Sequence, residues 1–264
     1  MTTRIFRAAQ AIVVTVGLAL ATSPAQAAVK TKTIEYQEGG VTLKGILAWD
    51  DAVSAKRPGV LVVHEWWGLN DYAKSRAEKL AAAGYIAFAL DMYGDDKVTE
   101  HAKQAGEWSN QISANTEAWR ARANAGLAVL KAQPQVDAGK IAAIGYCFGG
   151  STVMQMAYAG SDVKAVVSFH GSLPPAGEDV KSVKPRVLVA HGRDDKFIPA
   201  ERIVAFQAGL DRVGADWEMT IYSGARHAFT NPDAGKFGID NLAYNETADR
   251  RSWAAMLKLF GEVF

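Results

Sequence analysis

Short runs of apolar residues recur along the chain, and longer stretches with helical spacing separate them. Apolar runs bounded by turn-forming residues are typical of strands buried on both faces of a sheet. They predict strands at 59–63, 85–90, 141–145, 163–169, 186–190 and 217–222. Two earlier strands, at 32–36 and 41–49, are joined by a turn at 38–40. Apolar residues at helical spacing predict helices at 70–84, 116–131, 149–159, 200–213 and 247–260.

The order of these elements predicts the class of the fold. Strands that alternate with helices form a mostly parallel, twisted sheet with helices on both faces, so we expect an α/β fold. No repeat, low-complexity tract or linker divides the sequence, which predicts a single domain over residues 28–264. The connection from 171 to 185 is too short to form a large lid domain.

The first 27 residues have the pattern of a signal peptide. Arg4 and Arg7 precede an apolar run at 11–21, and Ala25-Gln26-Ala27 has the small side chains that a signal peptidase recognises. The apolar run is shorter than the roughly 20 residues that a membrane-spanning helix needs. We therefore expect cleavage after Ala27 and an exported protein, periplasmic or secreted, with no stable membrane insertion. An uncleaved anchor is the alternative.

Charge and composition narrow the possible partners. The 29 Lys and Arg residues balance 28 Asp and Glu residues, and no basic or acidic run is present. Nucleic acid and anionic membrane surfaces are therefore not expected as partners, and we expect a monomer that binds a small molecule. Cys147 is the only cysteine, so it cannot form an internal disulfide. It is either an inert core residue or a thiol kept for chemistry.

The segment 141–151 gives Cys147 a chemical context. A buried strand, a tight turn and a helix start follow one another, with Gly145 and Gly149 two residues before and after the cysteine. This is the G-x-nucleophile-x-G elbow, which presents a nucleophile at a helix N-terminus, where free amides and the helix dipole favour negative charge. We interpret Cys147 as the nucleophile and expect the amide of Phe148 to face the developing oxyanion.

An acid and a histidine should follow the nucleophile in chain order. The segment 191–199 matches the pattern H-G-x-x-D-x-x-I-P, which selects Asp195 over its neighbour Asp194. Of the five histidines only His227 lies beyond Asp195, in a glycine-containing loop after the last predicted strand. Loops of this kind commonly carry catalytic side chains. The predicted set is therefore Cys147, Asp195 and His227.

The other histidines have plainer interpretations. His170 and His191 follow predicted strands, where we expect them to hydrogen-bond to loop backbone. His101 is expected on the surface of a helix. No histidine stands beside carboxylates at the spacing of a metal site, so we expect neither a metal nor another cofactor.

The loop after Val63 contains His64-Glu65-Trp66-Trp67. In proteins with this nucleophile turn, the corresponding loop supplies the second oxyanion amide, which here would be the N–H of Trp66. Glu65 is unusual, because a buried carboxylate beside a thiol needs a partner; a salt-bridged loop residue is the alternative interpretation. Trp66 and Trp67 fit either the core or the wall of a site.

Several segments together resemble the dienelactone hydrolase family, whose members have the α/β-hydrolase fold. They are H-E-W-W-G at 64–68, L-D-M-Y at 90–93, G-Y-C-F-G-G at 145–150, the segment 191–199 and A-R-H-A-F at 225–229. The resemblance extends over nearly all of the chain after the signal peptide. It implies a Cys-His-Asp triad at Cys147, His227 and Asp195. It also implies that Glu65 holds the thiol in the resting enzyme until a bound substrate frees the thiolate.

The sequence departs from this family where the substrate would bind. The archetype hydrolyses an enol-lactone and binds its carboxylate with two arginines. One of these lies four residues after the catalytic histidine, where this sequence has Asn231. In the region 100–110, where the other is expected, only Lys103 is basic. The resemblance therefore predicts the fold and the nucleophile, but not dienelactone as the substrate.

Together these patterns predict a hydrolase that cleaves a carboxylic ester or lactone through an acyl-enzyme thioester on Cys147. A thioesterase or another acyl hydrolase with the same fold is the first alternative. The second is a non-catalytic binding protein, or a redox sensor in which Cys147 is reversibly oxidised.

Overall fold

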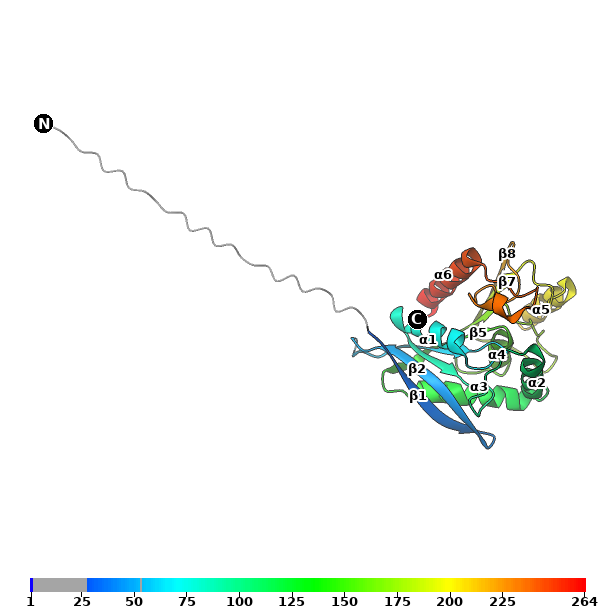
Figure 1. Ribbon diagram of the computed structural model, residues 1–264, viewed down its shortest axis with the longest axis horizontal. Helices are drawn as coiled ribbons and strands as arrows, with labels where there is room; N and C mark the ends of the chain where they lie inside the picture. Colours follow the sequence, from blue (N-terminus) through cyan, green and yellow to red (C-terminus); the bar gives the residue numbers. More distant parts are fainter. Residues whose placement is uncertain (2–27, 53) are drawn as a thin grey trace.

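The computed structural model describes residues 28–52 and 54–264, together with Met1 (Figure 1). Residues 2–27, which make up nearly all of the expected signal peptide, lie outside the described residues. Within the described chain, no helix is long and apolar enough to cross a membrane. The strands are β1 (Val29–Glu38), β2 (Val41–Asp50), β3 (Arg57–Val63), β4 (Ile86–Leu90), β5 (Val136–Tyr146), β6 (Ala165–Phe169), β7 (Arg186–Gly192) and β8 (Trp217–Tyr222).

Seven helical segments connect or follow the strands. They are α1 (Asp71–Ala82), α2 (Ala102–Ser113), α3 (Thr116–Lys131), α4 (Phe148–Tyr158), α5 (Ala200–Arg212), the 3₁₀ helix η1 (Ala234–Phe237) and α6 (Glu246–Val263). Asn70 caps α1, because its side chain accepts a hydrogen bond from the backbone N–H of Ala73 at 3.2 Å.

All eight strands belong to one sheet in the order β1-β2-β4-β3-β5-β6-β7-β8. The pairs β1–β2 and β2–β4 are antiparallel, and every pair from β4–β3 to β7–β8 is parallel. The predicted α/β-hydrolase fold, with its mostly parallel sheet, is therefore confirmed. The connection between β6 and β7 contains no helix or strand, and no lid domain lies there.

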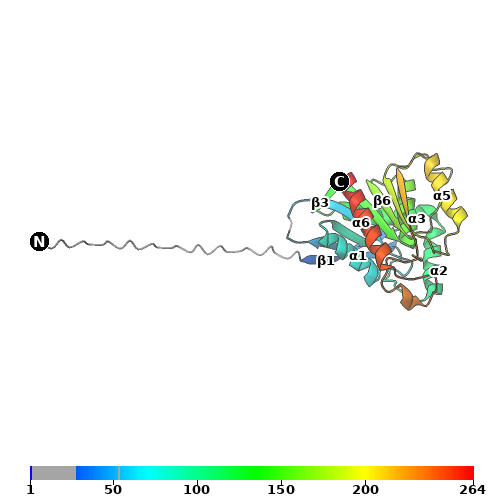
Figure 2. The same ribbon diagram turned by 90° about the horizontal axis from the view of Figure 1, so that it is seen from above.

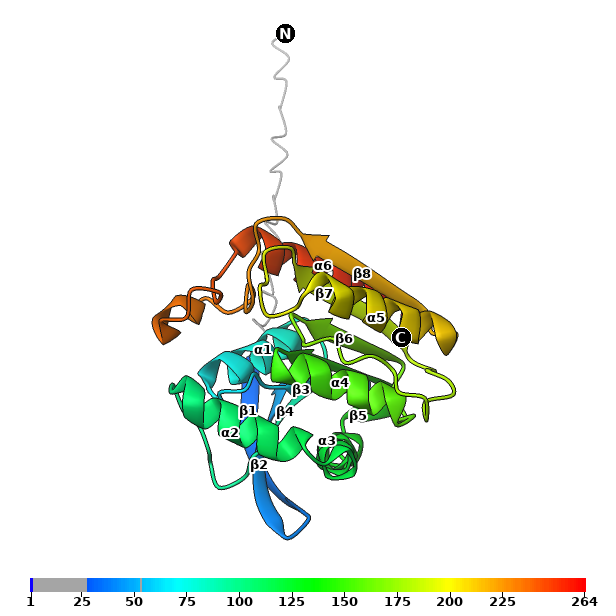
Figure 3. The same cartoon turned by 90° about the vertical axis from the view of Figure 1, so that its right-hand side faces the viewer.

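Helices cover both faces of the sheet (Figure 2, Figure 3). One face carries α1 and α6, which pack with Val60 and Val62 of β3 into one core. The opposite face carries α3, α4 and α5, which pack with Leu61 and Val63 of the same strand into a second core. Successive side chains of a strand point to opposite faces, so the continuous apolar run of β3 serves both cores.

Two elements differ from the sequence prediction for the same reason. No range was predicted for helix α2, although His101, which stands at its N-cap, was expected on a helix surface; Ala105 is its only buried residue. Strand β1 begins three residues earlier than expected, and it pairs with β2 along its whole length as an edge strand with mostly exposed side chains. An element that buries little apolar surface carries a weak hydrophobic periodicity, so the pattern could not reveal it.

A buried arginine joins the two helices on one face of the sheet. Arg76 of α1 pairs with Asp249 of α6, with 3.0 Å between Nη2 and Oδ1. Its guanidinium lies over the rings of Tyr72 and Tyr146, at 5.1 and 5.5 Å from their centroids. Arg76 also donates a hydrogen bond to the backbone carbonyl of Thr230. It thereby ties the loop that contains His227 to the helical layer.

Candidate active site

The turn from β5 to α4 contains Cys147 in a strained conformation. Its φ of 54° and ψ of −114° lie in a region that residues with a side chain rarely adopt. The turn closes because two glycines leave room for neighbouring backbone: a Cβ on Gly145 would lie 2.0 Å from the carbonyl oxygen of Gly149. A Cβ on Gly149 would lie 2.2 Å from that of Val63. The half-buried Cys147 therefore stands immediately before the first turn of α4.

His227 and Asp195 form a buried pair. His227 Nδ1 lies 2.7 Å from Asp195 Oδ2, and both side chains are buried. The second carboxylate oxygen accepts hydrogen bonds from the Phe197 backbone N–H at 2.9 Å and from Asn241 Nδ2 at 3.1 Å. Asp194 is exposed and makes no such contact. The structure therefore pairs His227 with Asp195, as the spacing of the motif predicts.

The protonation of His227 reflects its two neighbours. Burial alone would lower the pKa of His227, but the neighbouring Cys147 and the hydrogen bond that His227 donates to Asp195 outweigh burial and raise the pKa to about 10. The two residues meet at His170, whose Nδ1 accepts a hydrogen bond from the backbone N–H of Cys147 at 3.1 Å and whose ring lies edge-on to that of His227, with centroids 5.2 Å apart. An imidazolium between a thiolate and a carboxylate is the arrangement that activates a cysteine nucleophile.

The pKa of Asp195 moves the opposite way. Burial would raise the pKa of its carboxyl, but the hydrogen bond and charge of His227 and the hydrogen bonds from Phe197 and Asn241 together lower it. Asp195 is therefore ionised at neutral pH. The two hydrogen bonds that Asp195 accepts from Phe197 and Asn241 fix the orientation in which its other oxygen accepts the hydrogen bond from Nδ1–H of His227.

The two backbone amides that the sequence predicts for an oxyanion hole are free to act as donors. The N–H of Phe148 opens α4, and the N–H of Trp66 lies in the loop after β3. Neither N–H donates a hydrogen bond to another group of the described chain. The carbonyl of Trp66 accepts a hydrogen bond from the hydroxyl of Tyr93 at 3.0 Å, which helps to hold the loop after β3. Both amides predicted for an oxyanion hole are thus unsatisfied by the protein itself.

Glu65 is buried at the same end of the sheet. Asn231 Nδ2 donates a hydrogen bond to its Oε2 at 2.8 Å. Burial raises the pKa of Glu65 to about 7, although the hydrogen bond from Asn231 and the charge of His227 oppose this rise. The family resemblance implies an interaction of this glutamate with the thiol, whereas the hydrogen bond seen here goes to Asn231. A neutral amide thus occupies the place where the family archetype has a cation.

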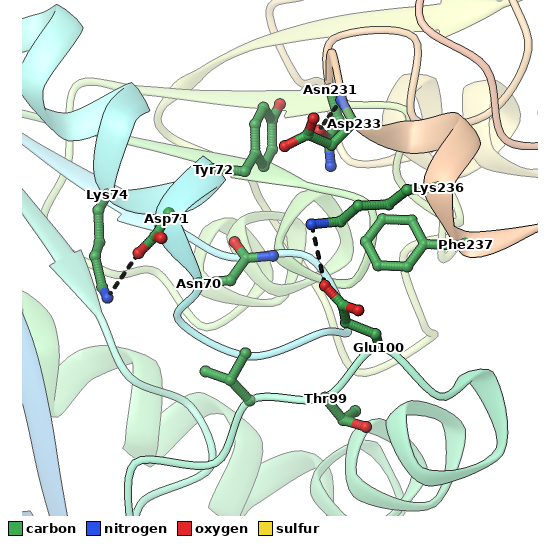
Figure 4. A pocket seen from close by; sticks show the side chains of 11 residues that line it. Asn70, Asp71, Tyr72, Lys74, Thr99, Glu100, Asn231, Asp233, Lys236 and Phe237 are labelled. Atoms are coloured by element: carbon green, nitrogen blue, oxygen red, sulfur yellow. Dashed lines mark hydrogen bonds and ion pairs between the residues drawn. The ribbon is translucent and has the colours of Figure 1, made fainter.

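Asn231 also borders a polar cavity of about 250 Å³ (Figure 4). Lys236 and Glu100 also line that cavity, and Lys236 Nζ pairs with the Glu100 carboxylate at 3.1 Å. Asn231 Oδ1 accepts a hydrogen bond from the backbone N–H of Asp233 at 2.9 Å, which fixes the amide group. The side-chain amide of Asn231, which bonds Glu65, is therefore itself fixed, at the edge of a cavity lined by charged side chains.

The two tryptophans after Glu65 have different roles. Trp67 is almost fully buried and its ring stacks on Phe237 with centroids 3.9 Å apart and planes at 8°, so it belongs to the core. Trp66 is partly buried and meets Trp67 edge-on. The sequence had left both interpretations open for both residues. The packing of Trp67 places it in the core, whereas Trp66 lies nearer the surface.

Three residues of the site were not predicted. Asn241 braces Asp195 from 46 residues further along the chain. Phe197, half exposed, meets the ring of His227 edge-on at a centroid distance of 5.2 Å. His170 was expected to bond loop backbone; the backbone that it bonds is the N–H of Cys147, at 3.1 Å. Asn241 and His170 reach the site through the packing of distant loops, so no local motif marks them. Phe197 lies within the segment 191–199, but nothing in that pattern shows that its ring meets His227.

Among the described residues, no group of three or more His, Cys, Asp or Glu side chains is placed to hold a metal ion. The sequence profile of the dienelactone hydrolase family matches residues 43–264. The chain belongs to the dienelactone hydrolase family. As a member of that family it is a dienelactone hydrolase-like hydrolase with the α/β-hydrolase fold.

Known relatives of this dienelactone hydrolase-like protein agree with that assignment. The crystal structure of a dienelactone hydrolase-like promiscuous phosphotriesterase from metagenomic libraries is 42% identical, with a TM-score of 0.87 over 90% of this chain and 99% of the other. Protein usf of Aquifex pyrophilus is 28% identical over 206 residues, which cover 75% of this chain and 86% of that protein. A candidate carboxymethylenebutenolidase of Aquifex aeolicus is 26% identical over 209 residues, with 75% and 86% covered.

The buried Glu65 predicts a pH-dependent loss of stability that Glu65→Gln should remove. With an ordinary value of 4.5 and a folded value of about 7, the pKa of Glu65 is raised by folding. The unfolded chain therefore ionises first, and stability falls as pH rises from about 4.5 to about 7, then stays level. The loss is about 3 kcal/mol, from about 1.4 kcal/mol for each pKa unit. Glutamine cannot ionise and still accepts the Asn231 hydrogen bond.

Urea unfolding at pH 5 and pH 8 measures this effect. The free energy of unfolding of Glu65→Gln relative to the native protein should increase between the two pH values. Glu78→Gln, at an exposed position of α1, is the matched control and should show no such increase. An equal difference between Glu65→Gln and the native protein at both pH values would contradict the assignment of this titration to Glu65.

Proposed function

We propose that this protein hydrolyses a carboxylic ester or lactone through a thioester on Cys147. The observation that carries the proposal is the buried hydrogen bond of 2.7 Å between His227 and Asp195, with His170 in contact with both the ring of His227 and the backbone N–H of Cys147. Each partner has the role that acyl transfer requires: a strained thiol, a proton carrier and a carboxylate that fixes the carrier's tautomer.

The first half of the reaction forms the acyl-enzyme. The Cys147 thiolate attacks the carbonyl carbon, and the resulting oxyanion accepts hydrogen bonds from the amides of Phe148 and Trp66. The tetrahedral intermediate then collapses, the carbon–oxygen bond to the alcohol breaks, and Nε2 of His227 gives its proton to the leaving oxygen. Asp195 holds Nδ1–H throughout and stabilises the imidazolium.

The second half releases the acid. Neutral His227 takes a proton from a water molecule, which attacks the thioester carbon. The second tetrahedral intermediate collapses with cleavage of the carbon–sulfur bond, so the thiolate is restored beside a protonated imidazole. The tetrahedral adduct of the first half must expel the leaving group rather than the sulfur of Cys147. Esters and lactones with good leaving groups should therefore react faster than amides.

The substrate class follows from the polar groups near Cys147. Asn231 stands where the family archetype has an arginine for a substrate carboxylate, and it is already engaged with Glu65. A dianionic or strongly acidic substrate would meet the buried Glu65 rather than a cation. We therefore propose an uncharged ester or lactone. The pattern of a signal peptide at 1–27 supports action outside the cytoplasm, in the periplasm or the medium.

A phosphotriester is the second candidate substrate. The relative that is 42% identical is a promiscuous phosphotriesterase. A site with a thiolate nucleophile and oxyanion donors suits an uncharged phosphorus centre as well as a carbonyl carbon, because negative charge develops on oxygen in both attacks. A thioesterase activity would use the same groups. Substrate comparison is the only way to order these reactions.

Trapping of the acyl-enzyme tests the proposal. The protein is mixed with a panel of aryl esters, lactones, thioesters and an aryl phosphotriester, quenched in acid and analysed by mass spectrometry. An increase by the mass of one acyl group, located on Cys147 by peptide mapping, is expected with the ester that turns over fastest, and none is expected in Cys147→Ala. Turnover without any adduct on Cys147, and unchanged in Cys147→Ala, would refute the proposal. Binding without turnover or adduct would favour the alternative of a redox sensor or binding protein.

A further inference from the structure

His170 directly follows β6 and has an unusual backbone conformation. Its φ is +40°, in the left-handed region, and its side chain is fully buried. Residues with a side chain persist in that region only where the surrounding structure holds them there. His170 lies opposite Cys147, which is strained in the same sense with a φ of +54°. Two strained residues on neighbouring parallel strands therefore meet at the nucleophile.

Each nitrogen of the His170 ring has its own partner. Nδ1 accepts a hydrogen bond from the backbone N–H of Cys147 at 3.1 Å, and that N–H is shared with the carbonyl of Phe169 at 3.0 Å. Because Nδ1 accepts, the ring proton is on Nε2, which donates to Thr230 Oγ1 at 2.7 Å. The ring of His170 also lies edge-on to that of His227, with centroids 5.2 Å apart.

Thr230 belongs to the loop that carries His227, three residues further along the chain. The hydroxyl of Thr230 shares a hydrogen bond of 2.6 Å with the hydroxyl of Tyr72, and Arg76 donates a hydrogen bond to the backbone carbonyl of Thr230. One side of His170 thus holds the turn that carries the nucleophile, and the other side holds the loop that carries the catalytic histidine. The chain Cys147–His170–Thr230–Tyr72 is continuous and buried.

The surroundings keep His170 neutral. Burial lowers the pKa of His170 well below its ordinary value, and the charges of His227 and Arg76 lower it further. A second proton on His170 would remove one of the two acceptors of the Cys147 amide and would place two imidazolium rings next to each other. A neutral histidine is therefore suited to this position, since it accepts at one nitrogen, donates at the other and adds no charge beside His227.

We propose that His170 is a positioning residue of the reaction, a neutral clamp that fixes Cys147 and the His227 loop relative to each other. The clamp rests on the proposed function, because it acts through the nucleophile and the proton carrier. Through the amide of Cys147 and the hydroxyl of Thr230 it fixes the nucleophile turn against the loop that carries His227. A shift of the nucleophile by about 1 Å can cost about 100-fold in rate.

Four variants test the clamp. His170→Leu removes both hydrogen bonds, His170→Asn keeps an acceptor at the Nδ1 position, and His170→Gln keeps a donor at the Nε2 position. His101→Leu, at an exposed position before α2, is the matched control. The readouts are kcat and KM for the best aryl ester, the pH dependence of Cys147 alkylation by iodoacetamide, and the midpoint of thermal unfolding.

The expected pattern is specific to a clamp. His170→Leu and His170→Gln should lose about 100-fold in kcat with little change in KM. Alkylation of their Cys147 should require a higher pH than in the native protein, because the imidazolium no longer stands beside the sulfur. His170→Asn should recover part of the rate, because it keeps the hydrogen bond to the Cys147 amide but not the one to Thr230, and His101→Leu should match the native protein. If His170→Leu does not fold, the comparison of His170→Asn with His170→Gln carries the test.

Two results would overturn the clamp. One is a native kcat and alkylation profile in His170→Gln. The other is an equal loss of thermal stability in all His170 variants with an unshifted alkylation profile, which would indicate a purely structural residue. Cys147→Ala in the same assay separates the two proposals. If it retains turnover, the proposed function fails; if it abolishes turnover while His170→Gln behaves as the native protein, only the clamp fails.

Discussion

Replacing Cys147 by alanine should lower kcat/KM for an activated aryl ester by about 10⁴-fold or more. Removal of the nucleophile of a triad costs about 10⁶-fold in a well-studied serine protease, and the remaining groups still bind substrate and polarise its carbonyl. The same residual catalysis is expected here, because the amides of Phe148 and Trp66 are backbone groups and survive the substitution. The fold should also survive, since the change removes only a half-buried sulfur.

Steady-state kinetics on purified protein check this result. The thermal unfolding midpoint of Cys147→Ala should stay near that of the native protein, which separates a chemical effect from unfolding. Cys147→Ser is a useful companion, because it keeps the shape of the side chain but has a hydroxyl that is far harder to ionise; it too should be severely impaired. Near-native turnover by Cys147→Ala would show that another group attacks the substrate.

Replacing Asp195 by asparagine should lower kcat by about 10⁴-fold with a small change in KM. Asparagine at the equivalent place of a serine protease triad has this effect, because the histidine is held in the wrong tautomer. The same is expected here, since Asp195 Oδ2 is the acceptor for Nδ1–H of His227 at 2.7 Å. The loss of this carboxylate also removes one of the interactions that raise the pKa of His227, so the pH–rate profile should shift.

Asp194→Asn is the matched control for this substitution. It is the adjacent aspartate, it is exposed, and its side chain does not contact His227. Its kcat should lie within about threefold of the native value, as is usual for an exposed substitution away from the site. Equal losses in Asp194→Asn and Asp195→Asn would mean that the loop as a whole, rather than the carboxylate of Asp195, supports catalysis.

The pair of Glu65 and Asn231 distinguishes this site from that of the family archetype. A buried carboxylate next to a cation would be held ionised, whereas the amide of Asn231 leaves the pKa of Glu65 at about 7. Glu65 therefore changes charge in the same range in which esterases commonly work. A negative charge there opposes the thiolate and favours the imidazolium of His227, so the activity of this enzyme should respond to pH through Glu65 as well as through the triad.

The sequence by itself determined the parts of this protein that depend on local pattern. Buried strands carry continuous apolar runs, so the parallel sheet and the order of its elements could be predicted. The elbow around Cys147 could also be predicted, because its glycines are needed where backbone passes within contact distance of backbone. Chain order then left His227 as the one histidine beyond Asp195. The range of helix α2 could not be predicted, because the helix buries almost no apolar surface.

Only the tertiary structure decided what reaches the site from distant loops. The pairing of Asn231 with Glu65 joins residues 166 positions apart, and Asn241 reaches Asp195 across 46 positions. His170 looked like an ordinary strand-end histidine, and its contacts with Cys147 and Thr230 exist only because three loops pack together. Hydrogen bonds of this kind depend on distances between side chains that no spacing along the chain encodes. Cys147 could therefore be singled out from the sequence as the candidate nucleophile, but the side chains that contact its turn and its neighbours could not.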